Sequence, residues 1–264
     1  MNELKLLWTD IGGVTWNGRG IIEAWRDEMS KKGWVMETDP SKWKECDLVF
    51  YGSDSQLQHC PQALGQKPTI LYFWGWMPAK MLDRNFQKIA MNQLQMMAQC
   101  TRILVPSLGT MDQCADFGLP SWVCLPGVDT KPLDSVGPQE RLHEVMFLSR
   151  LVPHKQLEAL IQAVSLIKPQ PGLLVVGAGD KEIYQRLASN LHLEVTFEGN
   201  LTDEEKAKEL KSSSVLVHPS SYEGFGLPPL EALYCGTPVI AFDIPQMRWL
   251  LQEDAYFFSS HEGL

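Results

Sequence analysis

The sequence has few of the features that mark metal-binding, membrane or nucleic-acid-binding proteins. Its six cysteines include no C-x-x-C pair and no accompanying histidine cluster, which argues against a zinc site. Asp and Glu number 32 against 23 Lys and Arg, and this net charge of −9 argues against non-specific binding to phosphate backbones. No apolar run approaches the roughly 18 residues of a membrane span, and the acidic start is unlike a signal peptide. We therefore expect buried, reduced thiols and a cytoplasmic protein without a transmembrane segment.

What is present is an ordinary globular composition in which short apolar strands alternate with amphipathic helices. The 264 residues are 44% hydrophobic, enough for one large domain or two modest ones. The run 69–74 (TILYFW) is too continuously apolar for a sheet with one wet face, and helical patterns at 21–32 and 85–99 flank it. This alternation predicts a parallel sheet covered by helices on both faces.

The alternation is interrupted once and then restarts. Residues 130–139 hold two prolines and a glycine with little apolar content, which is typical of an interdomain linker. About six strands follow, the first at 145–148 and the last at 255–258. We predict an N-terminal domain over 1–129, a linker over 130–143 and a C-terminal domain over 144–264. The chain stops in SSHEGL, which resembles a capped helix start, so we also expect a fragment or a short member of its class that lacks its last helices.

The strongest motif spans residues 219–240, PSSYEGFGLPPLEALYCGTPVI. A strand ends in a loop with Gly224 and Gly226, and the loop enters a helix whose first turn tolerates two prolines. Free N–H groups at such a helix start suit a diphosphate. Glu223 and Glu231 would lie at the rim of one crevice, where carboxylates accept hydrogen bonds from sugar hydroxyls. A solvated loop residue and an ordinary helix-surface residue are the alternatives, and the fixed order of glycines and prolines favours the site.

This segment resembles the E-x7-E region of glycosyltransferase family 4, the retaining enzymes of GT-B fold. Four further stretches resemble the same family: VMFLSRLVPHK with Arg150 and Lys155, the G-x-G turn of LLVVGAGD, the interdomain VCLPGVD, and ILVPS. The resemblance is specific over residues 102–258 and weaker over residues 1–100. It implies two Rossmann-like, doubly wound parallel-sheet domains that face a cleft.

The resemblance also implies roles for individual residues. Arg150 and Lys155 would bind the donor diphosphate and offset the charge of the leaving group, Glu223 would hold the transferred sugar, and Glu231 would bind the ribose hydroxyls. Arg150 follows the first strand of the second domain, at the strand end where open α/β sheets bind ligands. A solvated helix start is the alternative for both cations, and a plain turn is the alternative for the G-x-G. The other implied donor-binding residues are Gly177, Gly179, Gly199, Asn200, Leu201, Gly224, Phe225, Gly226 and Leu227.

Acceptor-side candidates lie in the N-terminal half. Gly12, Gly13 and Arg19 belong to a glycine-rich loop after the first strand, for which a flexible turn is the alternative. Trp74 lies in TILYFWGWMP, where family members often carry a histidine, and a core aromatic is the alternative there. No D-x-D metal motif is present, so the resemblance implies a metal-independent transfer without a cofactor, with a nucleotide diphosphate sugar as donor substrate.

These observations favour a retaining glycosyltransferase that moves a sugar from a nucleotide diphosphate sugar to a sugar, lipid-linked or other acceptor, with no nucleic-acid partner. A non-catalytic nucleotide-sugar-binding protein or partner subunit is the main alternative, favoured by the missing histidine. A nucleotide-sugar epimerase is a weaker one, because it would need acid–base groups facing the sugar. The donor sugar, the base, the acceptor and the oligomeric state do not follow from the sequence.

Overall fold

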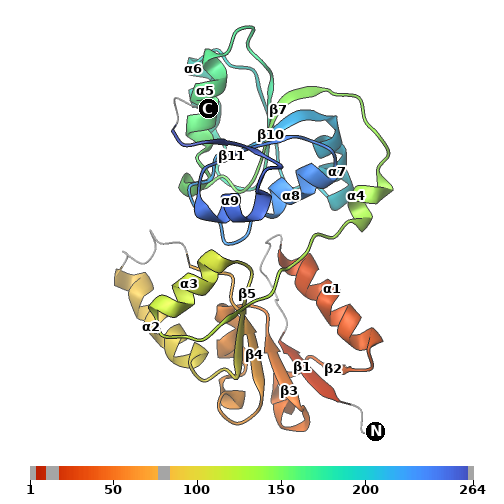
Figure 1. Cartoon of the computed structure of the whole chain (residues 1–264), viewed down its shortest axis with the longest axis vertical. Coiled ribbons are helices and arrows are strands. Elements are labelled where there is room, and N and C mark those ends of the chain that lie inside the picture. The colour runs from red at the N-terminus through yellow and green to blue at the C-terminus, as the bar shows by residue number, and fades with distance from the viewer. Residues whose placement is uncertain (1–3, 10–17, 77–83, 261–264) are drawn as a thin grey trace. The chain divides into compact units, whose positions relative to one another are not determined.

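The structure is a computed structural model that describes residues 4–9, 18–76 and 84–260, with the backbone alone for residues 18–20 and 84–86. It divides into two compact units, Met1–Gly127 and Val128–Leu264. Each unit contains one six-stranded sheet with helices on its faces (Figure 1). Neighbouring strands pair in parallel throughout both sheets.

The N-terminal unit has the strand order β2-β1-β3-β4-β5-β6. Its strands are β1 (Lys5–Thr9), β2 (Val35–Glu37), β3 (Leu48–Tyr51), β4 (Thr69–Tyr72), β5 (Arg102–Val105) and β6 (Trp122–Val123). Its α-helices are α1 (Gly18–Lys31), α2 (Arg84–Met97) and α3 (Leu108–Asp116). Three 3-10 helices lie between the strands: η1 (Pro40–Glu45), η2 (Asp54–His59) and η3 (Pro61–Ala63).

Each face of the N-terminal sheet buries its own apolar cluster. Helices α2 and α3 cover one face, where Met97 and Cys114 pack on the sheet, and α1 covers the other with Ile22 (Figure 1). Between α1 and the sheet lies an apolar cavity of about 270 Å³ that Trp8 and Phe50 help to line. This two-sided burial explains why the strand residues 70–72 are apolar without alternation.

The C-terminal unit has the strand order β12-β11-β10-β7-β8-β9. Its strands are β7 (His143–Leu148), β8 (Leu173–Val176), β9 (Val195–Glu198), β10 (Ser213–His218), β11 (Val239–Phe242) and β12 (Tyr256–Phe258). Its helices are α4 (Lys131–Ser135), the 3-10 helix η5 (Pro153–Lys155), α5 (Leu157–Leu166), α6 (Glu182–Asn190), α7 (Asp203–Ser212), α8 (Leu227–Tyr234) and α9 (Pro245–Leu251).

The central strand β7 shows how this sheet is sandwiched. Val145 and Phe147 pack into the cluster beneath α5 and α6, whereas Met146 and Leu148 face the cluster beneath α7, α8 and α9. Figure 1 shows α5 and α6 on the opposite side of the sheet from α7. Burying one such side chain stabilises the fold by roughly 1.5–3 kcal/mol, so this strand is a main anchor of the unit.

The order of the C-terminal strands creates one reversal point. From β7 the chain moves outward through β8 and β9, and then returns to start again at β10 on the other side of β7. In open α/β sheets a crevice forms at such a point, outside the carboxyl ends of the two strands. The loops after β7 and after β10 therefore border the position where a ligand is expected.

The predicted fold class of two doubly wound, parallel-sheet domains is confirmed, as are the six strands of the second half. The sequence predicts a linker over 130–143, and the structure has helix α4 within it. Pro132 suits the first turn of a helix, and the buried Leu133 accepts a hydrogen bond at its carbonyl from Lys211 Nζ at 2.7 Å. Tyr234 Oη also donates to Asp134 at 2.9 Å. These contacts attach α4 to the C-terminal unit.

Candidate functional site

The loops after β7 and β10 are joined where the sheet order reverses. The Ser221 backbone N–H donates to the His154 carbonyl at 2.9 Å. This bond brings the η5 turn, which ends at Lys155, against the loop that carries Glu223. Two segments 68 residues apart in sequence thus contribute facing side chains to one edge of the sheet.

Glu223 is the centre of a buried charged cluster. It is 8% exposed, and its Oε1 accepts a hydrogen bond from Lys155 Nζ and lies 2.6 Å from His218 Nε2. Burial by itself would raise the pKa of the Glu223 carboxyl, but the charges and hydrogen bonds of His218 and Lys155 hold it well below its usual range. The alternative of a solvated loop residue is therefore wrong, and the group is a fixed carboxylate.

Glu231 makes a second carboxylate–lysine pair. It is 8% exposed on α8, and its Oε1 accepts from Lys206 Nζ at 2.8 Å. The same ammonium lies 3.0 Å from Asp203 Oδ1. Burial disfavours the charge on Lys206, but Glu231 and Asp203 outweigh it and raise the pKa of the ammonium. The second oxygen, Glu231 Oε2, is buried and has no hydrogen-bond partner among the described residues.

Two glycines of the predicted donor site, Gly177 and Gly179, are required by backbone packing. Gly177 has φ +157°, and a Cβ there would lie 1.8 Å from the Ser149 carbonyl oxygen. Gly179 has φ +143°, and its added Cβ would meet Leu151 Cβ at 2.7 Å. These contacts press the loop after β8 against the loop after β7. The G-x-G turn therefore has a structural role that a plain turn explains, and its contribution to a nucleotide pocket stays a prediction.

Gly226 marks the start of α8. Its φ of +111° is a conformation that favours glycine, and an added Cβ would lie 2.4 Å from Met247 Cε on α9. Phe225 and Leu227 on either side of it are buried. The loop that carries Glu223 is thereby packed closely against α9 where it enters α8, the helix that carries Glu231.

The other predicted donor-site residues are placed differently. Arg150 is exposed at the carboxyl end of β7, and its guanidinium makes no hydrogen bond or ion pair with another residue of the described ranges. Gly199 and Asn200 are exposed after β9, and Leu201 packs against the cluster beneath α8. Gly224 lies beside Glu223 and is half-buried. Because all these strands are parallel neighbours, their loops lie along the same edge of the sheet.

Sequence reasoning misses two members of this site. His218 is 2% exposed and contacts Glu223, and the local signal for it is its position directly before the PSSYE segment. Lys206 lies in DEEKAKEL, where the local pattern indicates a solvated helix face. Its partner is 25 residues away, so the local sequence holds no signal for the pair.

The candidates of the N-terminal unit are less defined. Gly12, Gly13 and the side chain of Arg19 lie outside the described residues. Trp74 is half-buried, donates its indole N–H to the Gly52 carbonyl at 2.9 Å and packs edge-on against Tyr72. Packing explains the tryptophan, and an acceptor-side role for it stays a prediction.

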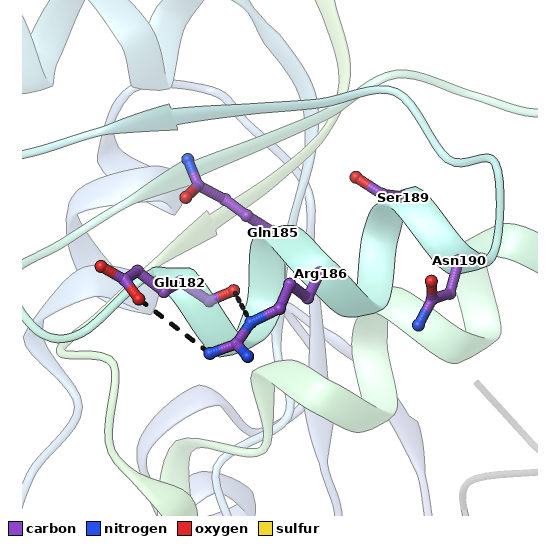
Figure 2. A pocket seen from close by; sticks show the side chains of 5 residues that line it. All are labelled: Glu182, Gln185, Arg186, Ser189 and Asn190. Carbon is purple, nitrogen blue, oxygen red and sulfur yellow. Dashed lines mark hydrogen bonds and ion pairs between the residues drawn. The ribbon is translucent and has the colours of Figure 1, made fainter.

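A hollow on the surface of α6 is lined by none of the residues of the charged cluster around Glu223. Figure 2 shows that its lining side chains, from Glu182 to Asn190, all come from that single helix. The Glu182–Arg186 ion pair at its edge is largely exposed, and such pairs contribute little energy. No group of three metal-ligating side chains is found in the described ranges. Within them no helix is both long and apolar enough to cross a membrane.

Comparison with known proteins finds a family match that falls in the C-terminal unit. Residues 133–261 match the sequence model of the family described as Glycosyl transferases group 1. The serotype-specific mannosyltransferase WbdA of Escherichia coli is 30% identical over 128 residues, which cover 45% of this chain and 16% of WbdA. The phosphatidyl-myo-inositol mannosyltransferase of Mycobacterium leprae is 33% identical over 114 residues, 41% of this chain and 30% of that protein. The match thus spans less than a third of either relative.

Comparison with solved structures extends over both units. HepE of Anabaena, solved with UDP and glucose, has a TM-score of 0.80 at 17% identity, covering 98% of this chain and 87% of HepE. Sucrose-phosphate synthase of Thermosynechococcus elongatus has a TM-score of 0.81 at 15% identity, with the same two coverages. At these identities the likeness establishes the fold. The chain thus has the GT-B fold of glycosyltransferases, and its residues 133–261 match the family Glycosyl transferases group 1.

Proposed function

We propose that this protein is a retaining glycosyltransferase that transfers a sugar from a nucleotide diphosphate sugar to a hydroxyl-bearing acceptor. The family match of residues 133–261 and the mannosyltransferase relatives support a glycosyltransferase enzyme. The UDP and UDP-glucose complexes of HepE support a nucleotide-sugar donor. The donor is the substrate itself, and the proposed reaction needs no further cofactor.

One observation carries the proposal: the buried Lys155–Glu223 pair at the reversal point of the C-terminal sheet. A buried ion pair is weak evidence for stability, because desolvation costs several kcal/mol per ion. Its position at the ligand-binding edge of an open α/β sheet favours a functional reason for it. His218 adds a second hydrogen bond to the same oxygen.

The proposed division of labour follows from the chemistry of each side chain. Departure of a nucleoside diphosphate leaves negative charge on its terminal phosphate, which fixed cations stabilise. Arg150 and Lys155 supply the positive charge that stabilises this phosphate. Arg150 is exposed and has no protein partner in the described ranges. Glu223, an acceptor-only carboxylate, orients hydroxyls of the transferred sugar, and Glu231 binds the ribose.

A matched pair of variants tests the proposal. Glu223→Gln keeps the shape of the side chain but loses the carboxylate that binds the sugar, whereas Glu204→Gln changes an exposed glutamate on α7. We expect Glu223→Gln to lower kcat for donor hydrolysis about 10- to 100-fold, as for one lost charge-assisted hydrogen bond, with nucleoside diphosphate affinity within about 3-fold. Glu204→Gln is expected to match the wild type in both.

Donor hydrolysis without acceptor also separates the enzyme from a non-catalytic binding protein. A panel of UDP- and GDP-sugars is incubated with the full chain, and release of the nucleoside diphosphate is followed. Slow release that depends on Glu223 supports transfer chemistry. Tight binding of a nucleoside diphosphate with no release from any donor would instead favour the binding-protein alternative. Equal loss of binding and turnover in Glu223→Gln would contradict the sugar-binding role of that residue.

A further inference from the structure

Lys206 and Lys208 lie on the same helix, α7, in different surroundings. The Lys206 side chain is only 16% exposed, whereas Lys208 is exposed. The Lys206 ammonium contacts carboxylates on two helices, Glu231 at 2.8 Å and Asp203 at 3.0 Å. The Asp203 side chain is 69% exposed and Glu231 is 10% exposed, so the bond to Glu231 is the less screened of the two.

The pair leaves the Glu231 carboxylate half satisfied. Lys206 binds Oε1, while the buried Oε2 has no donor within the described part of the chain. A buried carboxylate oxygen without a hydrogen-bond donor is costly, and a donor group of a ligand would remove that cost. With Oε1 held by Lys206, the carboxylate cannot rotate freely, and Oε2 has one fixed direction.

We propose that Lys206 is a positioning residue that fixes Glu231 through Oε1, so that Oε2 accepts a hydrogen bond from one ribose hydroxyl of the donor nucleotide. The consequence is specificity: the C-terminal unit distinguishes ribonucleotides from deoxyribonucleotides, and Lys206 sets how strongly it does so. A site built to hydrogen-bond a hydroxyl rejects the analogue that lacks it, because its own buried acceptor is then left unpaired. The inference rests on the proposed function, in which Glu231 contacts the ribose.

The test compares nucleoside diphosphates that differ by one hydroxyl. Binding of UDP and GDP to the full chain is measured by calorimetry, and the tighter of the two is compared with its 2′-deoxy and 3′-deoxy forms. We expect one deoxy form to bind the wild type about 10- to 100-fold more weakly, as for a lost hydrogen bond to a charged group. In Lys206→Met the discrimination is expected to shrink to less than about 3-fold.

Two variants control for charge and for helix changes. Lys206→Arg keeps a cation within reach of Glu231 and is expected to retain most of the discrimination. If only the packing of the aliphatic stem mattered, a cation at this position would not be required. Lys208→Met makes the same substitution at an exposed position of α7 and is expected to bind as the wild type does. If Lys206→Met does not fold, Lys206→Leu, which likewise lacks a hydrogen-bond donor, carries the same comparison.

The outcomes separate this inference from the proposed function. Suppose that Glu231→Gln abolishes the discrimination between the ribose and deoxyribose forms. Full discrimination in a folded Lys206→Met variant then overturns the role of Lys206. If Glu231→Gln itself leaves nucleoside diphosphate affinity and discrimination unchanged, the ribose-binding role of Glu231 is wrong and both proposals lose their support. Reduced discrimination in Lys206→Met and Glu231→Gln, with no further loss in the double variant, supports the coupling of the two residues.

Discussion

Lys155 and Lys206 each neutralise a glutamate from a different segment, through a single carboxylate oxygen. Such pairs are asymmetric in energy: taking away one partner leaves an uncompensated buried charge and costs about 3–5 kcal/mol, whereas replacing both by apolar residues can be nearly neutral. The pairs therefore add little net stability. Under the proposed function, they hold the two carboxylates at fixed positions before a ligand arrives.

Arg150 stands apart because it is exposed and unpaired within the described ranges. Arg150→Ala is expected to leave the free energy of unfolding within about 0.5 kcal/mol of the wild type, since the side chain is exposed and loses no hydrogen bond or ion pair within the described ranges. We expect the same change to weaken nucleoside diphosphate binding by about 2 kcal/mol, roughly 30-fold, as for a charge-assisted hydrogen bond to phosphate. Calorimetric titration measures this, with the exposed Arg186→Ala on α6 as control. Equal affinities in the two variants would remove Arg150 from the site.

The lowered pKa of Glu223 predicts a dependence of stability on pH. A carboxyl group with a lower pKa in the folded chain than its ordinary 4.5 adds stability that is fully present above that value and is lost as the pH falls below it. The free energy of unfolding, measured with urea, should therefore fall more steeply between about pH 5 and pH 3 for the wild type than for Glu223→Gln. Glu204→Gln should keep the wild-type slope, and parallel curves for all three proteins would show that Glu223 is not held as described.

At the scale of elements, continuous apolar runs are what the sequence reveals best. The run LLVV at 173–176 forms β8 over the same residues, and Thr202 caps α7 in a full capping box with Glu205. Short or atypical elements are missed: β2 has three residues and α9 begins at Pro245. Tertiary packing, rather than local propensity, stabilises both, so no local pattern identifies them.

The turns before the helices give a ranked prediction for three glycines. Gly177→Ala drives a Cβ into a backbone oxygen that cannot move away, and we expect destabilisation of about 3 kcal/mol or more. Gly226→Ala meets the flexible end of Met247 in a positive-φ conformation, for about 1–3 kcal/mol. Gly199→Ala has open space around it and should cost less than about 0.5 kcal/mol. Chemical denaturation gives the order, and a reversal between Gly177 and Gly199 would contradict the described turn.

At the scale of the whole molecule, the two units divide the chain into separate cores. The clusters around β7 contain only residues of the C-terminal unit, and those around β1 and β4 only residues of the N-terminal unit. The sequence predicts this division from the interrupted alternation. The partners within the site are harder to predict, since Lys206 and Glu231 meet only after α7 and α8 pack on the same sheet.

Separate cores predict separate thermal transitions. Scanning calorimetry of the full chain should resolve two transitions, and a saturating nucleoside diphosphate should move only one of them. At 100 times its Kd the ligand adds about 2.7 kcal/mol to the unit that binds it. Hydrogen exchange then assigns the shifted transition, with protection expected in the loops after β7 and β10. A shift of both transitions together would show that ligand binding is shared between the units.

The confinement of both carboxylate–lysine pairs to residues 128–264 has a practical consequence for engineering. If residues 128–264 are fused to the amino-terminal half of a protein with the same fold, both carboxylate–lysine pairs are retained. If the proposed function holds, chimeras of this kind should keep the nucleoside diphosphate preference of the parent that supplies residues 128–264. Recombination at the junction near Gly127 therefore tests where that preference resides.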